Sequence, residues 1–153
     1  MKKIVCLLAV LAAVLFANVA NGGSFSAAPV APATDPSVAI RAVLDAQVAA
    51  WNHGDIDAYM NGYANSDDTM FVGADVTSGW TKVRDRYKAK YDSKSKMGTL
   101  VFSDIEMRPL GADDVVVTGA WKLTRAADTP HGRFTLIFHH RSEGWRIVYD
   151  HSS

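Results

Sequence analysis

The sequence predicts an α+β domain in which helices come first and a bent antiparallel sheet follows. Two observations carry this prediction. Between residues 36 and 91, apolar side chains recur every three to four positions, which is typical of amphipathic helices. From residue 99 onward they alternate with polar side chains around short Gly-containing turns, which is typical of antiparallel strands. Helices followed by a run of strands favour helices packed on one face of a single sheet.

Composition bounds the answer to one ordinary globular domain. The chain has 153 residues, of which 48% are hydrophobic and 21% charged, so a substantial core can form. The 16 basic and 16 acidic residues balance each other. The balance gives no electrostatic argument for binding nucleic acid or an anionic membrane surface.

Residues 1–22 have the three parts of a secretory signal peptide. Lys2 and Lys3 precede the apolar run 4–17, and small residues follow that run. The run falls short of the ~20 residues that span a bilayer. The only cysteine, Cys6, lies inside this leader, so the processed chain has no disulfide and no thiolate ligand or nucleophile. We therefore expect an exported protein, periplasmic or secreted.

Residues 23–35 are rich in Gly, Ser, Ala and Pro and predict a flexible linker. The domain itself is expected over residues 36–153. Asp35 is a typical N-cap and Pro36 a typical first helical residue. The apolar spacing then predicts a helix to about Asn52, where a His-Gly pair provides a stop.

Asp55 is expected to cap a second helix from Ile56 to about Ala64, followed by a short strand over 69–72 and a loop over 73–79. A third helix is predicted over 80–91. Its cations leave two interpretations open, a solvated helix face or an anion or nucleic-acid site, and we favour the solvated face. These cations are Lys82, Arg84, Arg86, Lys88 and Lys90.

The rest of the chain predicts a four-strand antiparallel meander. Its alternating segments are 99–108, 115–125 and the two arms of a closing hairpin over 132–153. In the last arm, alternation places Ile147, Tyr149 and His151 on one face, and we expect this face to line a cavity.

The chain contains the stretches AAWNHGDIDAYMNGYA at 49–64, GRFTLIF at 132–138 and GWRIVYDHSS at 144–153. Together they resemble the nuclear transport factor 2-like superfamily, within its SnoaL-like branch, over about residues 36–153. The resemblance implies a cone-shaped, strongly curved antiparallel sheet wrapped around the N-terminal helices and enclosing a cavity. Members are often dimers through the outer sheet face, so we expect a homodimer. Such a fold implies a pocket without fixing a chemistry.

Ketosteroid isomerase belongs to this superfamily and can be compared through the shared N-x-G-D-x-D motif of residues 52–57. The resemblance puts its oxyanion tyrosine at Gln47 and its general-base aspartate at or near Val72. Glutamine is a weak donor and valine cannot take a proton. We therefore do not expect steroid-isomerase chemistry.

His151 is the best single candidate for acid–base chemistry, because an ordinary histidine titrates near pH ~6.5. The alternative, a core histidine hydrogen-bonded near the chain end, stands beside it. Asp150 points to the opposite face of an ideal strand, so it is a poor partner unless the strand bends. A metal site from His140, His151 and a carboxylate lacks any supporting spacing, so we expect neither a metal nor a cofactor.

Aromatic side chains are the richest functional feature of the sequence. Rings around a partly open cone would form an apolar pocket with tyrosine and tryptophan donors for one polar ligand group. The alternative is that the rings fill the cone. The expected pocket residues are Trp51, Tyr59, Tyr63, Phe71, Trp80, Trp121, Phe134, Phe138, His140 and Tyr149.

These observations favour a binding module for a small apolar or aromatic molecule. One alternative is a lyase, isomerase or hydrolase that acts through His151, and a second is a structural association domain with a filled cone. The expected partners are a small-molecule ligand and a second copy of the chain. We expect neither nucleic acid nor, after removal of the leader, a membrane.

Overall fold

The computed structural model describes residues 35–153. The predicted signal peptide, 1–22, and residues 23–34 of the predicted linker lie outside this part. Within it, no helix combines the length and the apolar character that crossing a membrane requires.

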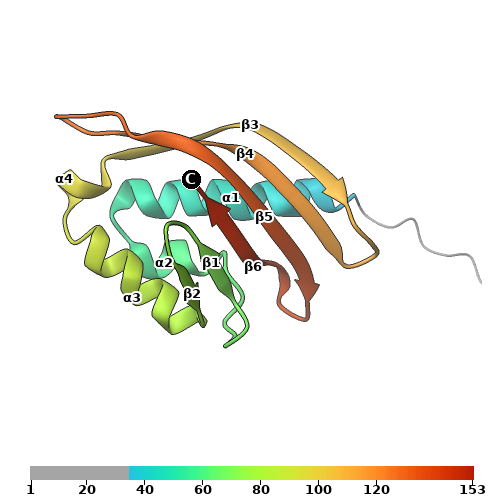
Figure 1. Cartoon of the computed structure of the whole chain (residues 1–153). Helices are drawn as coiled ribbons and strands as arrows, with labels where there is room; N and C mark the ends of the chain where they lie inside the picture. Colours follow the sequence, from blue (N-terminus) through green and yellow to red (C-terminus); the bar gives the residue numbers. More distant parts are fainter. Residues whose placement is uncertain (1–34) are drawn as a thin grey trace, which may run out of the picture. The chain divides into compact units, whose positions relative to one another are not determined.

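Six strands form one curved, open sheet, and the helices lie on one side of it (Figure 1). The strands are β1 (Met70–Val72), β2 (Val76–Ser78), β3 (Thr99–Pro109), β4 (Asp114–Thr124), β5 (His131–Arg141) and β6 (Gly144–Ser152). Their order across the sheet is β2-β1-β6-β5-β4-β3. The predicted α+β class and the antiparallel meander from β3 to β6 are confirmed.

The sheet is mixed rather than wholly antiparallel, because β1 pairs in parallel with β6. The chain between them contains the helices α3 (Trp80–Lys90) and α4 (Lys94–Met97), and such a crossover is what a parallel pair requires. The predicted loop 73–79 is also wrong in part, since β2 forms within it and pairs with β1 as a short hairpin.

The helices are α1 (Pro36–His53), α2 (Ile56–Met60), α3 (Trp80–Lys90) and α4 (Lys94–Met97). Figure 1 shows α1 running beneath the long strands, with α3 below it. As predicted, Asp35 caps α1 by accepting a hydrogen bond from the Ser37 amide at 2.9 Å, and the helix ends at Gly54, whose φ is 86°. The buried side of α1 consists of Ile40, Leu44, Gln47 and Trp51.

Helix α2 ends at Met60, four residues earlier than predicted. The following residues instead run along β6: the Ala64 amide donates to the Ile147 carbonyl at 2.8 Å, and the Ile147 amide donates to the Gly62 carbonyl at 2.9 Å. A Cβ at Gly62 would lie 2.6 Å from the Gln47 side chain, so any larger residue here would force that buried side chain to move. The turn after α2 thereby brings Tyr63 next to β6.

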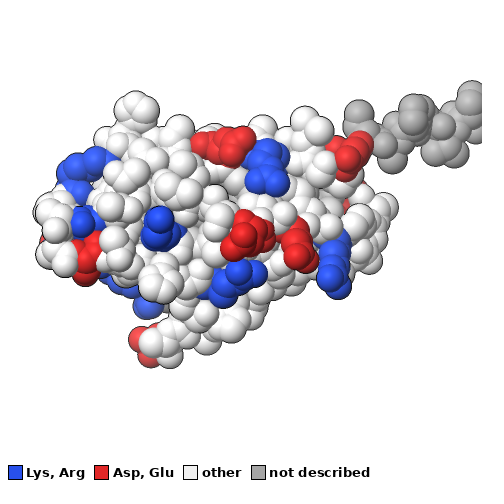
Figure 2. All heavy atoms as spheres, turned by 90° about the horizontal axis from the view of Figure 1, so that it is seen from above, with Lys and Arg blue, Asp and Glu red and all other residues white. Residues whose placement is uncertain are grey.

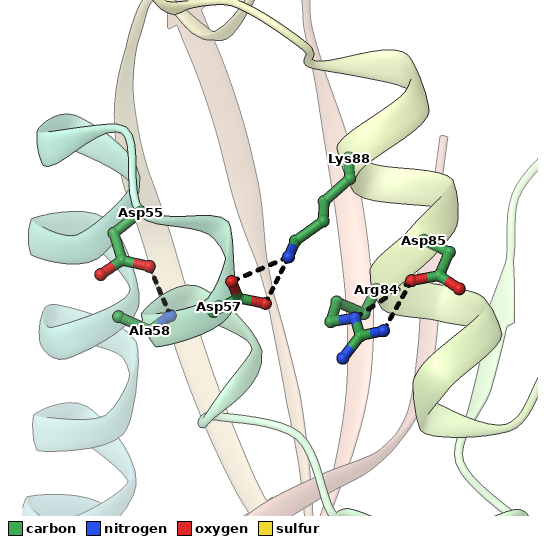
Figure 3. A network of polar contacts seen from close by, with 6 residues as sticks. All are labelled: Asp55, Asp57, Ala58, Arg84, Asp85 and Lys88. Atoms are coloured by element: carbon green, nitrogen blue, oxygen red, sulfur yellow. Dashed lines mark hydrogen bonds and ion pairs between the residues drawn. The ribbon is translucent and has the colours of Figure 1, made fainter.

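The outer side of α3 is tied to α2 by charge (Figure 3). Lys88 Nζ lies 2.8 Å from the Asp57 carboxylate, and Arg84 pairs with its neighbour Asp85 at 2.9 Å. Asp55 caps α2 by accepting from the Ala58 amide at 2.8 Å. These ion pairs are partly exposed, so each contributes only ~0–1 kcal/mol to stability.

Charges of both signs are interspersed on the face seen from above in Figure 2, and wide areas of that face carry neither. No field of one sign covers it. This pattern agrees with the balanced composition of the chain.

Candidate functional site

A cavity of about 320 Å³ lies between the helices and the inner face of the sheet. Side chains from α1, α2 and α3 form one wall, and side chains from β3 to β6 form the other. The strand wall is mostly aliphatic and aromatic, with Leu100, Phe102, Leu123, Phe134, Leu136 and Ile147. The cavity is therefore apolar over most of its surface.

Tyrosine and tryptophan rings form the helical wall. Trp51 packs edge-on against Tyr59, with ring centroids 5.2 Å apart, and against Tyr91 at 4.7 Å. The Trp51 indole donates to the Met97 carbonyl at 3.1 Å, so its one polar group is satisfied. Tyr87 packs edge-on against Phe71 at 5.8 Å. These contacts hold the rings in place around the cavity.

One polar cluster interrupts the apolar lining. The Tyr63 hydroxyl donates to Asp150 Oδ2 at 2.6 Å, and the Ser152 hydroxyl donates to Oδ1 at 2.7 Å. The Tyr87 hydroxyl lies 3.3 Å from that of Tyr63. Since Tyr63 has one proton and gives it to Asp150, Tyr87 is the donor in this second contact. A chain of hydrogen bonds thus runs from Tyr87 to the buried carboxylate.

Burial sets the protonation behaviour of this cluster. Asp150 is only 3% exposed, and burial raises the pKa of its carboxyl, although the hydrogen bonds from Ser152 and Tyr63 oppose the rise. Burial also raises the pKa of Tyr63, and the charge of Asp150 raises it further. The hydroxyl therefore stays protonated and available as a donor.

A β-bulge places Asp150 in the cavity. Phe138 pairs with Ile147 and Ile137 with Tyr149, so Val148 is an extra residue on β6. Past this residue, the inward and outward faces of the strand are exchanged relative to simple alternation. Asp150 and Ser152 consequently line the cavity.

The bulge overturns the expected position of His151. It is exposed and does not line the cavity, and neither does Tyr149. The expected position of His151 inside the cavity is therefore wrong, and so is the alternative of a core histidine. The carboxyl that alternation had assigned to the outer face is the one that points inward.

The remaining predicted pocket residues divide into two groups. Those that line the cavity are Trp51, Tyr59, Tyr63, Phe71, Trp121 and Phe134. Three others lie elsewhere: Phe138 is fully buried in the core, His140 packs on Trp145 with ring centroids 5.1 Å apart, and the Trp80 indole donates to the Met60 carbonyl at 3.0 Å. Trp80 thus fastens α3 to α2.

The family model for the SnoaL-like domain matches residues 40–153. This chain belongs to the SnoaL-like family. The resemblance inferred from the sequence is thereby confirmed. No curated protein matches this SnoaL-like chain.

Solved structures share the fold of this SnoaL-like domain. An NTF2-like protein of unknown function from Shewanella oneidensis MR-1 is 38% identical, with a TM-score of 0.74 over 78% of this chain and 99% of that chain. A ketosteroid isomerase-like protein from Erwinia carotovora atroseptica is 19% identical, with a TM-score of 0.60 over 78% and 96%. A putative calcium/calmodulin-dependent protein kinase II association domain from Xanthomonas campestris is 20% identical, with a TM-score of 0.62 over 81% and 91%. The last two likenesses concern the fold alone.

Of the two positions compared with ketosteroid isomerase, only one lines the cavity of this SnoaL-like domain. Gln47 lines the cavity, is 2% exposed and donates to the Tyr59 carbonyl at 3.2 Å. Val72 does not line the cavity. The carboxyl of this cavity comes instead from β6, through Asp150.

Sequence reasoning missed several cavity residues, above all Asp150, Ser152 and Tyr91. One feature of the sequence does indicate the bulge: Ile147, Val148 and Tyr149 are three consecutive apolar residues in a strand that otherwise alternates. Within residues 35–153, no three His, Cys, Asp or Glu side chains gather into a group that could hold a metal ion. The site is a largely apolar cavity with one carboxyl–hydroxyl cluster and two cationic side chains, Arg86 and Lys90, in its lining.

Proposed function

We propose that this SnoaL-like domain binds a small, largely apolar molecule in the cavity between its helices and its sheet. The observation that carries this proposal is an aromatic and aliphatic lining that converges on one polar cluster, built on Asp150 and Tyr63. The cavity volume of about 320 Å³ lies at the lower end of the ~300–1,000 Å³ of small-molecule pockets. Such a site takes a molecule with an apolar body and few polar groups.

The polar cluster gives the ligand its orientation. Tyr63 and Ser152 already donate to Asp150, so the carboxylate is held in one position without a ligand. Tyr59 and Tyr87, from the helical wall, also line the cavity, and the Tyr87 hydroxyl lies 3.3 Å from that of Tyr63. A ligand carbonyl or hydroxyl beside this cluster can form a hydrogen bond with side chains that are already held in position. Such preorganisation lowers the entropic cost of binding.

We also propose that the domain acts after export and as a homodimer. The leader-like residues 1–22 support export, and the family resemblance supports the dimer. The native mass of the protein recovered from its cells tests both, because it reports leader removal and the number of copies together. A full-length monomer would contradict both.

Filling the cavity is expected to abolish binding of an uncharged aromatic probe. Leu123 is 3% exposed and lines the cavity, so Leu123→Trp places a ring inside it. We expect N-phenyl-1-naphthylamine, a dye that brightens when it leaves water, to bind the native protein and to bind this variant at least about tenfold more weakly. Fluorescence titration measures both affinities.

The matched control is Val101→Trp, which adds the same ring at a residue on β3 that is 47% exposed. This variant should bind the dye as the native protein does. Leu136→Phe gives a second, smaller filling in case Leu123→Trp folds poorly. Equal dye binding by all four proteins would contradict the proposed site.

A second candidate function is acid–base catalysis by Asp150. The observation that favours it is a buried carboxyl of raised pKa in a cavity, hydrogen-bonded to a tyrosine. The same carboxyl could take a proton from a carbon next to a ligand carbonyl.

Deuterium exchange into 2-tetralone, followed by NMR, tests this candidate. If Asp150 is the base, the native protein should accelerate exchange next to the carbonyl, and Asp150→Asn should lower that rate by on the order of 10²-fold. Asp113→Asn, at a carboxylate outside the cavity, is the control. If the native protein gives no acceleration, the binding function alone stands.

A further inference from the structure

The cations of α3 fall into two groups with different surroundings. Arg84 and Lys88 lie on the outer side, where carboxylates neutralise them (Figure 3). Arg86 and Lys90, one helical turn apart, line the cavity. The prediction that the cations of this helix form a solvated face therefore holds for only some of them.

Arg86 is partly exposed, lines the cavity and stacks on an aromatic ring of its lining. Its guanidinium carbon lies 5.1 Å from the centroid of the Phe71 ring, over the ring itself. A Cβ at Gly73 would lie 3.6 Å from Arg86 Nη2, so the group sits beside the turn between β1 and β2. Both Phe71 and Gly73 line the cavity. The guanidinium thus lies against two residues of the cavity lining.

Lys90 extends the same positive edge. Its ammonium lies 5.3 Å from the centroid of the Tyr91 ring, another cavity residue. Among residues 35–153, neither Arg86 nor Lys90 has a carboxylate within ion-pair distance. Asp150 is the one acidic side chain in the lining, and its oxygens are occupied by Tyr63 and Ser152. The positive charge at this edge is therefore available to an anion.

We propose that Arg86 and Lys90 recognise the carboxylate of an aromatic or apolar acid whose body fills the cavity. This inference rests on the proposed binding function and names its ligand class. A guanidinium stacked on an aromatic ring keeps its N–H donors in a plane and can offer two of them to a carboxylate. Lys90 adds a point charge nearby. The apolar lining favours an anion with an apolar body over one without, because only the former buries apolar surface on binding.

The test compares two probes of nearly equal shape, 2-naphthoate and its uncharged amide, 2-naphthamide, by isothermal titration calorimetry. We expect the native protein to bind the carboxylate at least about fivefold more tightly than the amide. Arg86→Gln should weaken binding of the carboxylate by about tenfold and leave the amide unchanged. Added salt should weaken binding of the carboxylate and leave binding of the amide unchanged.

Lys82→Gln is the matched control, because Lys82 is an exposed cation of the same helix that does not line the cavity. It should leave both affinities unchanged. The double variant Arg86→Gln and Lys90→Gln should bind carboxylate and amide equally. Glutamine is a good helix former, so these variants are expected to fold.

Failure of the anion-recognising edge and failure of the binding function give different results. If the carboxylate and the amide bind the native protein equally, or if Arg86→Gln weakens both alike, the anion-recognising edge is overturned and the cavity stands. The edge is likewise overturned if the native protein binds N-phenyl-1-naphthylamine but neither naphthalene probe. If it binds none of the three, the proposed binding function falls as well.

Discussion

Above pH 10 the folded domain is expected to lose stability at up to about 4 kcal/mol per pH unit. Three cavity tyrosines cause this steep loss, because burial raises the pKa of Tyr59, Tyr63 and Tyr87 above the ordinary value of 10. The charge of Asp150 is the next cause for Tyr59 and Tyr63, and the charge of Tyr59 is the next for Tyr87.

The direction of the effect follows from proton binding. In the unfolded chain these tyrosines ionise near pH ~10, whereas in the folded chain they keep their protons to higher pH. The folded state then binds more protons than the unfolded state, so the free energy of unfolding falls as pH rises. Their contribution is complete below pH 10 and is lost progressively above it. Each tyrosine adds up to about 1.4 kcal/mol per pH unit.

Urea unfolding between pH 8 and pH 11.5 measures this slope, and the ultraviolet absorbance of tyrosinate shows when the rings ionise. Tyr87→Phe is the informative variant, because it removes one titrating hydroxyl that faces the cavity and should lower the slope by about one third. Ionisation of every tyrosine near pH 10 while the protein stays folded would contradict the buried hydrogen-bonded cluster.

The parts of the fold that were predicted correctly depend on local chemistry. Asp35 and Pro36 begin α1 and Gly54 ends it, and these three residues act within one helical turn of their own position. The long strands alternate over many residues, so their existence was predictable even where their ends were not. In contrast, α2 ends early because Tyr63 and Ala64 pair with Ile147, a partner far along the chain.

The candidate site depended on one residue that periodicity cannot place. A single insertion at Val148 exchanges the two faces of β6, so Asp150 enters the cavity and His151 leaves it. A bulge is decided by how two strands pair, and a one-strand pattern contains little of that information. The aromatic cavity residues of α1 and α2 were easier to predict, because Trp51 and Tyr59 lie on the apolar sides of their helices.

Trp51→Ala is expected to destabilise the domain by about 3–5 kcal/mol. Trp51 is 3% exposed, and its ring contacts those of Tyr59, Tyr87 and Tyr91 at centroid distances between 4.7 and 6.2 Å. The substitution removes these contacts and the hydrogen bond from the indole to the Met97 carbonyl. Trp51→Phe keeps an aromatic ring and should destabilise the domain less than Trp51→Ala.

Trp145→Ala is the matched control, since Trp145 lies in the hairpin at the start of β6, is partly exposed and does not line the cavity. Urea unfolding of both variants at pH 7 gives the comparison, and Trp145→Ala should cost clearly less, because a partly exposed ring loses less buried area. Trp51 also joins α1 to the segment before β3 through Met97, so its loss should loosen the helical wall as well as empty it. If Trp51→Ala cost no more than Trp145→Ala, the ring would be a replaceable part of the cavity lining, and the helical wall would be held by the tyrosines and the Asp150 cluster instead.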